Sequence, residues 1–275
     1  MKNKLWIYGC SYSDNWNDRV LSHDDTWYGI IANKFNLDYK RIWDNNHCEL
    51  DEATHFATGG EGWLYTQQMI LRTAKLWNKN DLVIIEEPPR NRTRIFNLDS
   101  NYSLHEQEKS DAKILSTIVP EHYNYIRKDY PLYTSEVDRL DEIGFNKKNK
   151  SWVQIQELLN FLQYRDTILS LSNLHPNIYT WSNDGDVFNF YWHDDGSKSE
   201  GNLNPFWNTY KESMGSRLLK FGEFDNFTDW MGNYPSYWND IKILDNHQNE
   251  KGHGAQGWMF LEPVSYTHLT LPTKA

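Results

Sequence analysis

Three short segments of the chain are predominantly apolar, at residues 5–8, 81–85 and 177–181. Gly9 ends the first segment and Pro88 follows the second, as expected where a strand stops. Short apolar runs of this kind are typical of parallel strands, because helices cover both faces of such a sheet. We therefore expect these segments to be buried parallel strands.

Between these segments, apolar side chains recur at intervals of three and four residues, which is the spacing of one face of a helix. The pattern predicts helices over about 26–36, 63–78 and 151–172. Asp25 and Thr26 stand at the start of the first of these helices and are suitable N-caps. The helices therefore alternate with the expected strands along the chain.

The region between the first two helices is ambiguous, because either 39–43 or 54–57 could form another strand. Strands that alternate with helices predict an α/β fold with a doubly wound parallel sheet. In such sheets, ligands bind where the carboxyl ends of the strands meet. The loops expected to converge there follow Tyr8, Ala57, Ile85 and Trp181.

Two long segments, 92–150 and 182–240, are polar, aromatic and without a regular period. Connections of this length are uncommon in a compact domain, so we interpret both as insertions into a single domain over 1–263. Residues 264–273 read VSYTHLTLPT, which resembles a translated sequencing-library adapter. We therefore interpret 264–275 as a non-native tail left by assembly of short metagenomic reads.

The composition narrows the class of protein. The 275 residues include 28 Lys and Arg and 38 Asp and Glu, a formal net charge of −10, which disfavours a nucleic-acid-binding surface. No apolar stretch approaches the roughly 20 residues of a membrane-spanning helix, and the run at 5–8 is too short for a signal peptide. Two cysteines are too few for a disulfide framework. We expect a cytoplasmic protein that binds neither nucleic acid nor membrane; its oligomeric state stays open.

The sequence Gly9-Cys10-Ser11 directly follows the first expected strand. A serine at a strand-to-helix turn can present its hydroxyl, with backbone N–H groups free to face a ligand. The same serine could instead cap a helix. Cys10 is an alternative nucleophile, although we expect it to pack inward as a small apolar side chain.

This block resembles the first block of the SGNH (GDSL-like) hydrolases, particularly divergent phage-type members. Three further blocks match in the same order: HFATGGEGW, DLVII, and DNH followed by Gly252-His253. The resemblance is spread over most of residues 1–261. It implies a flavodoxin-like α/β fold, a phage-encoded or cytoplasmic protein, and a serine hydrolase that needs no cofactor.

The resemblance also implies a catalytic triad. The serine of the first block is the family's nucleophile and corresponds to Ser11, while His247 corresponds to the general base and Asp245 to the residue that orients it. The carboxylate lies two residues before the histidine here, whereas many members use three. Asp240 is therefore the alternative partner of His247.

An oxyanion hole is implied by the same blocks. The backbone N–H groups of Ser11 and Gly60 and the side chain of Asn91 correspond to the family's donors. His55 stands where the family usually has an asparagine, and the sequence PPRN replaces a glycine-containing turn before Asn91.

Other ionisable residues offer competing interpretations. His253 is the nearest competitor for the general base, but we expect it to pack within the last helix. Glu86 and Glu87 follow a strand and could act as an acid and base pair. As neighbours in a strand they would point to opposite sides of the sheet, which weakens that hypothesis.

The leading hypothesis is a serine esterase that hydrolyses an acyl ester, with an O-acetyl group on a glycan as the candidate substrate. The contrasting hypothesis is a non-catalytic glycan-binding module with the same fold. A metal-dependent phosphoesterase is a third, although the His and Asp residues at 22–25 and 192–196 are better explained as solvated loops than as metal ligands. Tryptophan rings could stack on sugars or fill the core of an insertion, and the substrate-binding candidates are Trp192, Trp207 and Trp238, with Trp181 and Trp230 nearby in sequence.

Overall fold

A computed structural model describes the backbone of residues 2–10, 12–13, 22–41, 52–57, 62–88, 92–96, 132–136, 147–183, 190–192, 198–200, 204–233 and 248–268. Side chains are described throughout these ranges except at 23, 64, 92–96, 132–136, 147–158, 160, 190–192, 198–200, 204–207 and 266–268.

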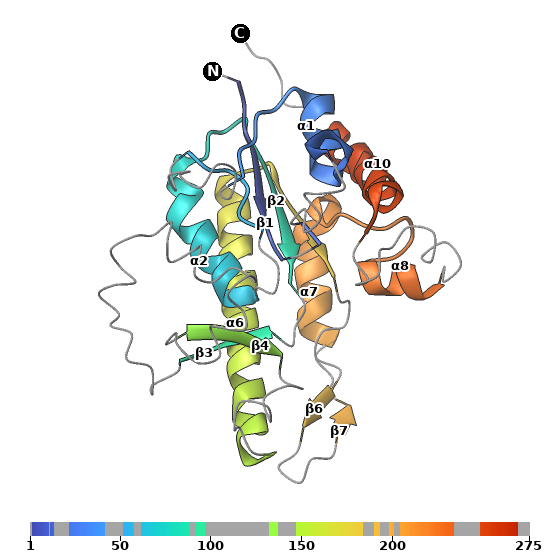
Figure 1. Cartoon of the computed structure of the whole chain (residues 1–275). Helices are drawn as coiled ribbons and strands as arrows, with labels where there is room; N and C mark the ends of the chain where they lie inside the picture. Colours follow the sequence, from blue (N-terminus) through green and yellow to red (C-terminus); the bar gives the residue numbers. More distant parts are fainter. Residues whose placement is uncertain are drawn as a thin grey trace.

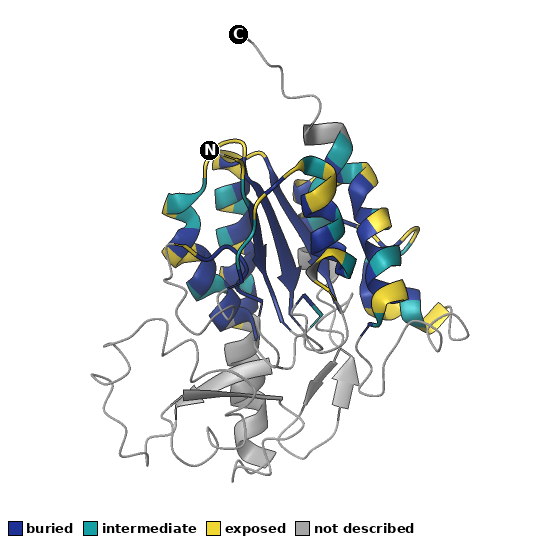
Figure 2. Ribbon diagram, turned by 45° about the horizontal axis from the view of Figure 1, so that its top comes forward, coloured by how far each residue is buried: buried dark blue, intermediate teal, exposed yellow. Residues whose placement is uncertain are grey.

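The centre of the molecule is a three-stranded parallel sheet with the order β1-β2-β5 (Figure 1). All side chains of these strands are buried, because helices cover both faces of the sheet (Figure 2). The strands span Leu5–Tyr8, Leu82–Glu87 and Ile178–Ser182. The mixed α/β class and the three parallel strands expected from the sequence are therefore confirmed.

Further backbone contacts extend this sheet at both edges. On the outer side of β1, the Ile7 N–H donates to the Thr54 carbonyl at 2.8 Å, and the Phe56 N–H donates to the Ile7 carbonyl at 2.7 Å. On the outer side of β5, the Leu219 N–H donates to the Thr180 carbonyl at 2.7 Å. Both additions run parallel to the strands that they join. Of the two ambiguous segments, 54–57 therefore lies beside β1. In the described part of 39–43, Arg41 forms a single bridge to His55.

One face of the sheet is covered by α2 (Trp63–Thr73), α6 (Lys147–Leu174) and α7 (Asn204–Met214). The opposite face is covered by α1 (Trp27–Phe35), α8 (Phe227–Asn233) and α10 (Glu250–His268). The cores on the two faces are rich in aromatic side chains, and this accounts for part of the high aromatic content. Short 3-10 helices lie at His23–Asp25, Ala74–Leu76 and Gly215–Arg217.

The bounds of α1 are set by a capping residue at each end. Thr26 caps α1, and its Oγ1 accepts a hydrogen bond from the Gly29 N–H at 3.1 Å. Asn36 ends the helix in the left-handed conformation, with φ of 53°. Both caps are encoded locally, so the predicted helix over 26–36 is confirmed.

The two segments interpreted as irregular insertions contain regular structure that the sequence analysis missed. Strands β3 (Arg92–Phe96) and β4 (Leu132–Glu136) form an antiparallel pair, and β6 (Phe190–Trp192) pairs with β7 (Lys198–Glu200). Helices α7 and α8 also lie within 182–240, so describing that segment as irregular was wrong. The pattern of α7 was obscured because Asn, Lys, Glu and Ser separate its few apolar positions.

The last helix continues past residue 263, where the adapter-like sequence begins, and ends at His268. Val264 is fully buried against the core on the α1 face. The described helix therefore includes residues 264–268 of the segment that resembles an adapter.

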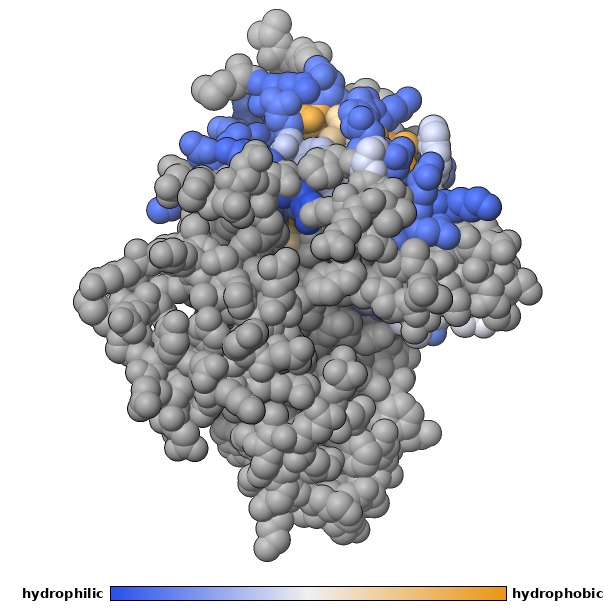
Figure 3. Space-filling view, in the orientation of Figure 1, coloured by the Kyte–Doolittle hydropathy of each residue, from blue (hydrophilic) through white to orange (hydrophobic). Residues whose placement is uncertain are grey.

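The described surface is largely hydrophilic on the face shown in Figure 3, with small apolar areas between the polar side chains. The large exposed apolar side chains in the described part of the chain are distributed over three helices, with Leu71 on α2, Leu159 and Leu174 on α6, and Trp258 on α10. Within the described ranges, no helix combines the length and apolarity required to span a bilayer.

Candidate functional site

The carboxyl ends of β1, β2 and β5 meet at one edge of the sheet, because the strands are parallel and adjacent. A turn directly follows β1 at this edge, and the Ser13 N–H closes it by donating to the Cys10 carbonyl at 3.1 Å. The expected nucleophile, Ser11, is bonded to Cys10 and Tyr12 on either side but lies outside the described residues.

Glu86, near the end of β2, holds the start of this turn. Its Oε2 accepts a hydrogen bond from the Cys10 N–H at 2.9 Å, and its Oε1 accepts one from the Cys10 thiol. Gly9 makes this approach possible, since a Cβ added there would lie 2.5 Å from both Cβ and Oε2 of Glu86. Cys10 is fully buried as expected, but its thiol meets a carboxylate rather than an apolar surface.

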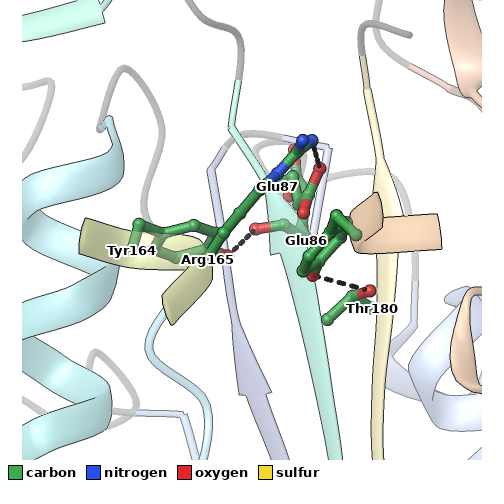
Figure 4. A network of polar contacts seen from close by, with 6 residues as sticks. Glu86, Glu87, Tyr164, Arg165 and Thr180 are labelled. Carbon is green, nitrogen blue, oxygen red and sulfur yellow. Dashed lines mark hydrogen bonds and ion pairs between the residues drawn. The ribbon is translucent and has the colours of Figure 1, made fainter. Parts of the chain in front are cut away.

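Glu87 points to the opposite face and forms a buried ion pair with Arg165 of α6, with 3.1 Å between Oε2 and an η nitrogen (Figure 4). The side chains are 0% and 5% exposed, respectively. The Arg165 guanidinium carbon also lies 3.8 Å from the ring centroid of Phe161 and 4.3 Å from that of Tyr210. The prediction that adjacent Glu86 and Glu87 diverge is confirmed, so they do not form an acid and base pair.

Two tyrosines complete this network as neutral hydroxyl groups. Tyr210 donates to the Thr180 hydroxyl at 3.2 Å, and Tyr164 donates to the backbone carbonyl of Glu86 at 3.4 Å (Figure 4). Burial raises the pKa of both hydroxyls well above the ordinary value, and the negative charge of Glu87 raises the pKa further. The tyrosines therefore serve as hydrogen-bond donors rather than as bases at neutral pH.

His55 holds the other end of the turn. Its Nε2 lies 2.8 Å from the Ser13 carbonyl oxygen, and because a carbonyl can only accept, Nε2 carries the proton. The ring is fully buried and lies 4.6 Å from the ring of Tyr28, centroid to centroid. The indole N–H of Trp27 adds a longer contact of 3.4 Å to the Tyr12 carbonyl.

The remaining candidates from the sequence cannot be placed together in the described part of the molecule. Trp192 lies on β6 and Trp207 on α7, with only their backbones described. Trp181 and Trp230 are buried in the core on the α1 face, which supports the core-filling interpretation for these two rings. The candidates that lie outside the described residues are Ser11, Gly60, Asn91, Trp238, Asp240, Asp245 and His247.

His253 is a packed histidine of α10, as the sequence analysis expected. It is 4% exposed, and its Nδ1 accepts from the Trp27 N–H at the start of α1, at 3.5 Å. A ring held in this way supports the contact between the first and last helices described here, and it is a poor candidate for a general base.

The described residues contain no group of three or more His, Cys, Asp or Glu side chains that could hold a metal ion. Residues 23–25 form a 3-10 turn, in which the His23 side chain is not described. The second candidate loop, at 193–196, lies outside the described residues.

Arg165 was missed by the sequence analysis, although a signal for it exists. It follows Phe161 by four residues and precedes Ile168 by three, so it occupies a core position on α6. A charged residue at such a position indicates a buried partner of opposite charge. The carboxylate of Glu87, at the end of an apolar strand, is that partner.

In comparisons with known proteins, no protein-family model, no curated protein and no solved structure matches this chain.

Proposed function

We propose that the protein is a serine hydrolase of SGNH type that cleaves an acyl ester, with Ser11 as its nucleophile. The observation that carries the proposal is the turn after β1, which lies at the carboxyl edge of a parallel sheet and is held by side chains from two neighbouring segments. Active-site groups in α/β folds lie at this edge.

The order of the strands supports a flavodoxin-like fold. With its two flanking segments included, the sheet runs in the order 54–56, β1, β2, β5, 218–219. Numbered along the chain, this is the order 2-1-3-4-5 of a doubly wound sheet, in which ligands bind at the switch point between strands 1 and 3. Here that point lies between β1 and β2, where Glu86 meets Cys10.

In the proposed mechanism, the Ser11 hydroxyl attacks the carbonyl carbon while His247 takes its proton, and Asp245 orients the imidazole. The tetrahedral oxyanion accepts hydrogen bonds from the N–H groups of Ser11 and Gly60 and from Asn91. Collapse of the intermediate breaks the ester bond, and His247 protonates the departing alcohol. Water, deprotonated by His247, then releases the carboxylic acid from Ser11.

The substrate proposed for this chemistry is an acyl ester carried by a glycan, such as an O-acetyl group. The segments 92–150 and 182–240 are proposed insertions, and the first begins directly beyond the carboxyl end of β2. Trp192, Trp207 and Trp238 are the rings in the second segment that are proposed to stack on sugar.

A fluorophosphonate probe tests the nucleophile directly, because it forms a covalent bond with an activated serine. We expect the wild-type protein to be labelled, Ser11→Ala to lose all labelling, and His247→Ala to lose most of it. Ser13→Ala is the matched control, since Ser13 is a buried serine of the same turn and should leave labelling unchanged. Folded wild-type protein that takes up no probe would overturn the proposal.

One observation favours the alternative of a non-catalytic glycan-binding module. Two buried carboxylates, Glu86 and Glu87, end β2 directly before the sequence PPRN, which replaces the glycine-containing turn of the resembling family. Under this alternative, Ser11→Ala binds acetylated glycans with the affinity of the wild-type protein, and neither protein releases acetate.

A further inference from the structure

Three side chains from different segments bond the backbone of the turn that follows β1. We propose that two of them, Glu86 and His55, are positioning residues that clamp this turn from both sides and so fix the hydroxyl of Ser11. This inference rests on the proposed function, because it assigns a purpose to the clamp through the serine that the turn carries. Trp27 makes the third and longest contact.

The clamp on the amino-terminal side is a carboxylate with little freedom to move. Glu86 is fully buried and belongs to the central strand β2, which is paired with β1 on one side and β5 on the other. Its Oε2 lies 2.9 Å from the Cys10 nitrogen, and a hydrogen bond to a carboxylate is stronger than one between neutral groups. The absence of a Cβ at Gly9 lets the carboxylate approach the backbone this closely.

The clamp on the carboxyl-terminal side is an imidazole held by its own segment. The backbone of His55 bridges to Ile7 of β1 and to Arg41, and its ring packs against Tyr28. From this fixed position Nε2–H donates to the Ser13 carbonyl at 2.8 Å. The two clamps therefore hold the N–H of Cys10, one residue before Ser11, and the carbonyl of Ser13, two residues after it.

Such a clamp matters for catalysis because a nucleophile must be held close to its productive geometry. A displacement of about 1 Å can slow a reaction by about a hundredfold, and supporting residues outside the reacting set provide the required precision. The covalent bonds from Ser11 to Cys10 and Tyr12 transmit the position of the held backbone to the serine. Loosening either clamp should lower the rate of the chemical step rather than remove the nucleophile.

The test compares apolar with conservative variants at each position. Glu86→Met and His55→Leu remove the acceptor and the donor, whereas Glu86→Gln and His55→Gln retain a side-chain oxygen and an N–H group at similar reach. Asp81→Asn is the matched control, because Asp81 is a buried carboxylate that bonds backbone N–H groups at the opposite end of the same sheet. It should lower stability without changing the reactivity of the folded protein.

Two rates are measured on the full chain. The first is the rate constant for fluorophosphonate labelling of Ser11. The second is the hydrogen-exchange rate of the Ser13 amide, whose N–H donates to the Cys10 carbonyl and not to any of the substituted side chains. We expect the apolar variants to slow labelling by about 10 to 100-fold and to speed exchange by at least about tenfold. The conservative variants should stay within about threefold of wild type in both measurements, a rescue that general destabilisation would not produce.

Each outcome decides the inference. Wild-type labelling rates in both apolar variants, or faster amide exchange without slower labelling, would overturn it. If the wild-type protein is not labelled at all, the proposed esterase function fails, and unchanged amide exchange would then also exclude the clamp. Should an apolar variant fail to fold, Glu86→Asp and His55→Asn replace it, since both shorten the reach of the side chain and should slow labelling by about three to tenfold.

Discussion

The two ends of the parallel sheet use buried carboxylates in different ways. At the amino end, Asp81 accepts hydrogen bonds from the backbone N–H groups of Lys4 and Asn78 and from the Trp6 indole, all within 2.9 Å. At the carboxyl end, Glu86 and Glu87 meet a thiol, one backbone N–H and a guanidinium. The Asp81 contacts join the beginnings of β1 and β2, whereas the Glu86 contacts hold the turn beside the candidate nucleophile.

The same chemical group, a buried carboxylate, therefore serves two purposes in one sheet. Asp81 bonds groups within the strands or directly before them, so it contributes to the free energy of unfolding. Glu86 reaches beyond the end of β1, and Glu87 reaches across to α6. Substitutions at the two ends should therefore separate the free energy of unfolding from the reactivity of the site.

The largest effect is expected from Arg165→Met, which leaves the Glu87 carboxylate buried without its cation. An uncompensated buried charge should cost about 3 to 5 kcal/mol of unfolding free energy, measured by urea denaturation. The double variant Arg165→Met, Glu87→Gln should recover most of that loss. If the double variant is as unstable as the single one, the loss comes from the packing of Arg165 on Phe161 and Tyr210 instead.

At the opposite end, Asp81→Asn should cost about 2 to 3 kcal/mol, because the amide nitrogen cannot accept the hydrogen bonds that one carboxylate oxygen now accepts. Urea denaturation measures the loss, and the unfolding midpoint should shift without a change in slope. Serine labelling at a temperature where the variant is folded should match wild type. Slower labelling would show that the two ends of the sheet are coupled.

Gly9→Ala is expected to have a smaller effect on stability, since it forces a Cβ against Glu86. The control is Gly215→Ala, because Gly215 also has a positive φ, of 54°, but has open space around its Cβ position. We expect Gly9→Ala to exceed this control by about 1 to 2 kcal/mol in thermal or urea unfolding. Equal losses would indicate that the carboxylate moves aside easily.

The smallest effect concerns the partly exposed carboxylate of Asp225, which forms ion pairs with Lys211 and Lys220. Burial alone would raise the pKa of Asp225, but the ammonium groups of Lys220 and Lys211 lower it below the ordinary value. The carboxylate therefore contributes stability that is fully present above the unfolded-state pKa of about 3.9 and is lost as the pH falls through the lower folded-state value. Asp225→Asn should cost about 0.5 kcal/mol at pH 7 and progressively less as the pH falls below about 3.9, measured by urea unfolding across this range.

The parts of the fold that were predictable are those with local signals. The apolar run at 5–8 and the caps of α1 specify a buried strand and a helix without reference to the rest of the chain. The pairing of β3 with β4 joins residues about forty positions apart, and no local pattern indicates that contact. For the same reason the bounds of α1 were predicted closely, while the content of 92–150 and 182–240 was not.

The features of the candidate site also divide into those with local sequence signals and those that depend on distant contacts. The position of the Gly9-Cys10 turn followed from the strand that precedes it, and the burial of Cys10 followed from its place after that strand. The roles of His55 and Arg165 depend on contacts with residues 42 and 78 positions away, which are decided by the packing of the sheet and helices. The proposed triad stays a prediction from the sequence blocks.

The pairing of α1 with α10 has a consequence for how the protein is made. His253 of α10 accepts from the first N–H of α1, and Phe260 packs against Trp27, although about 220 residues separate the starts of these helices. At a synthesis rate of roughly 5 to 20 residues per second, about 10 to 45 seconds pass between the synthesis of α1 and that of α10, the helix that packs against it. During that interval its aromatic face is open to chaperones, so slowing or truncating translation near residue 250 should promote aggregation of the nascent chain.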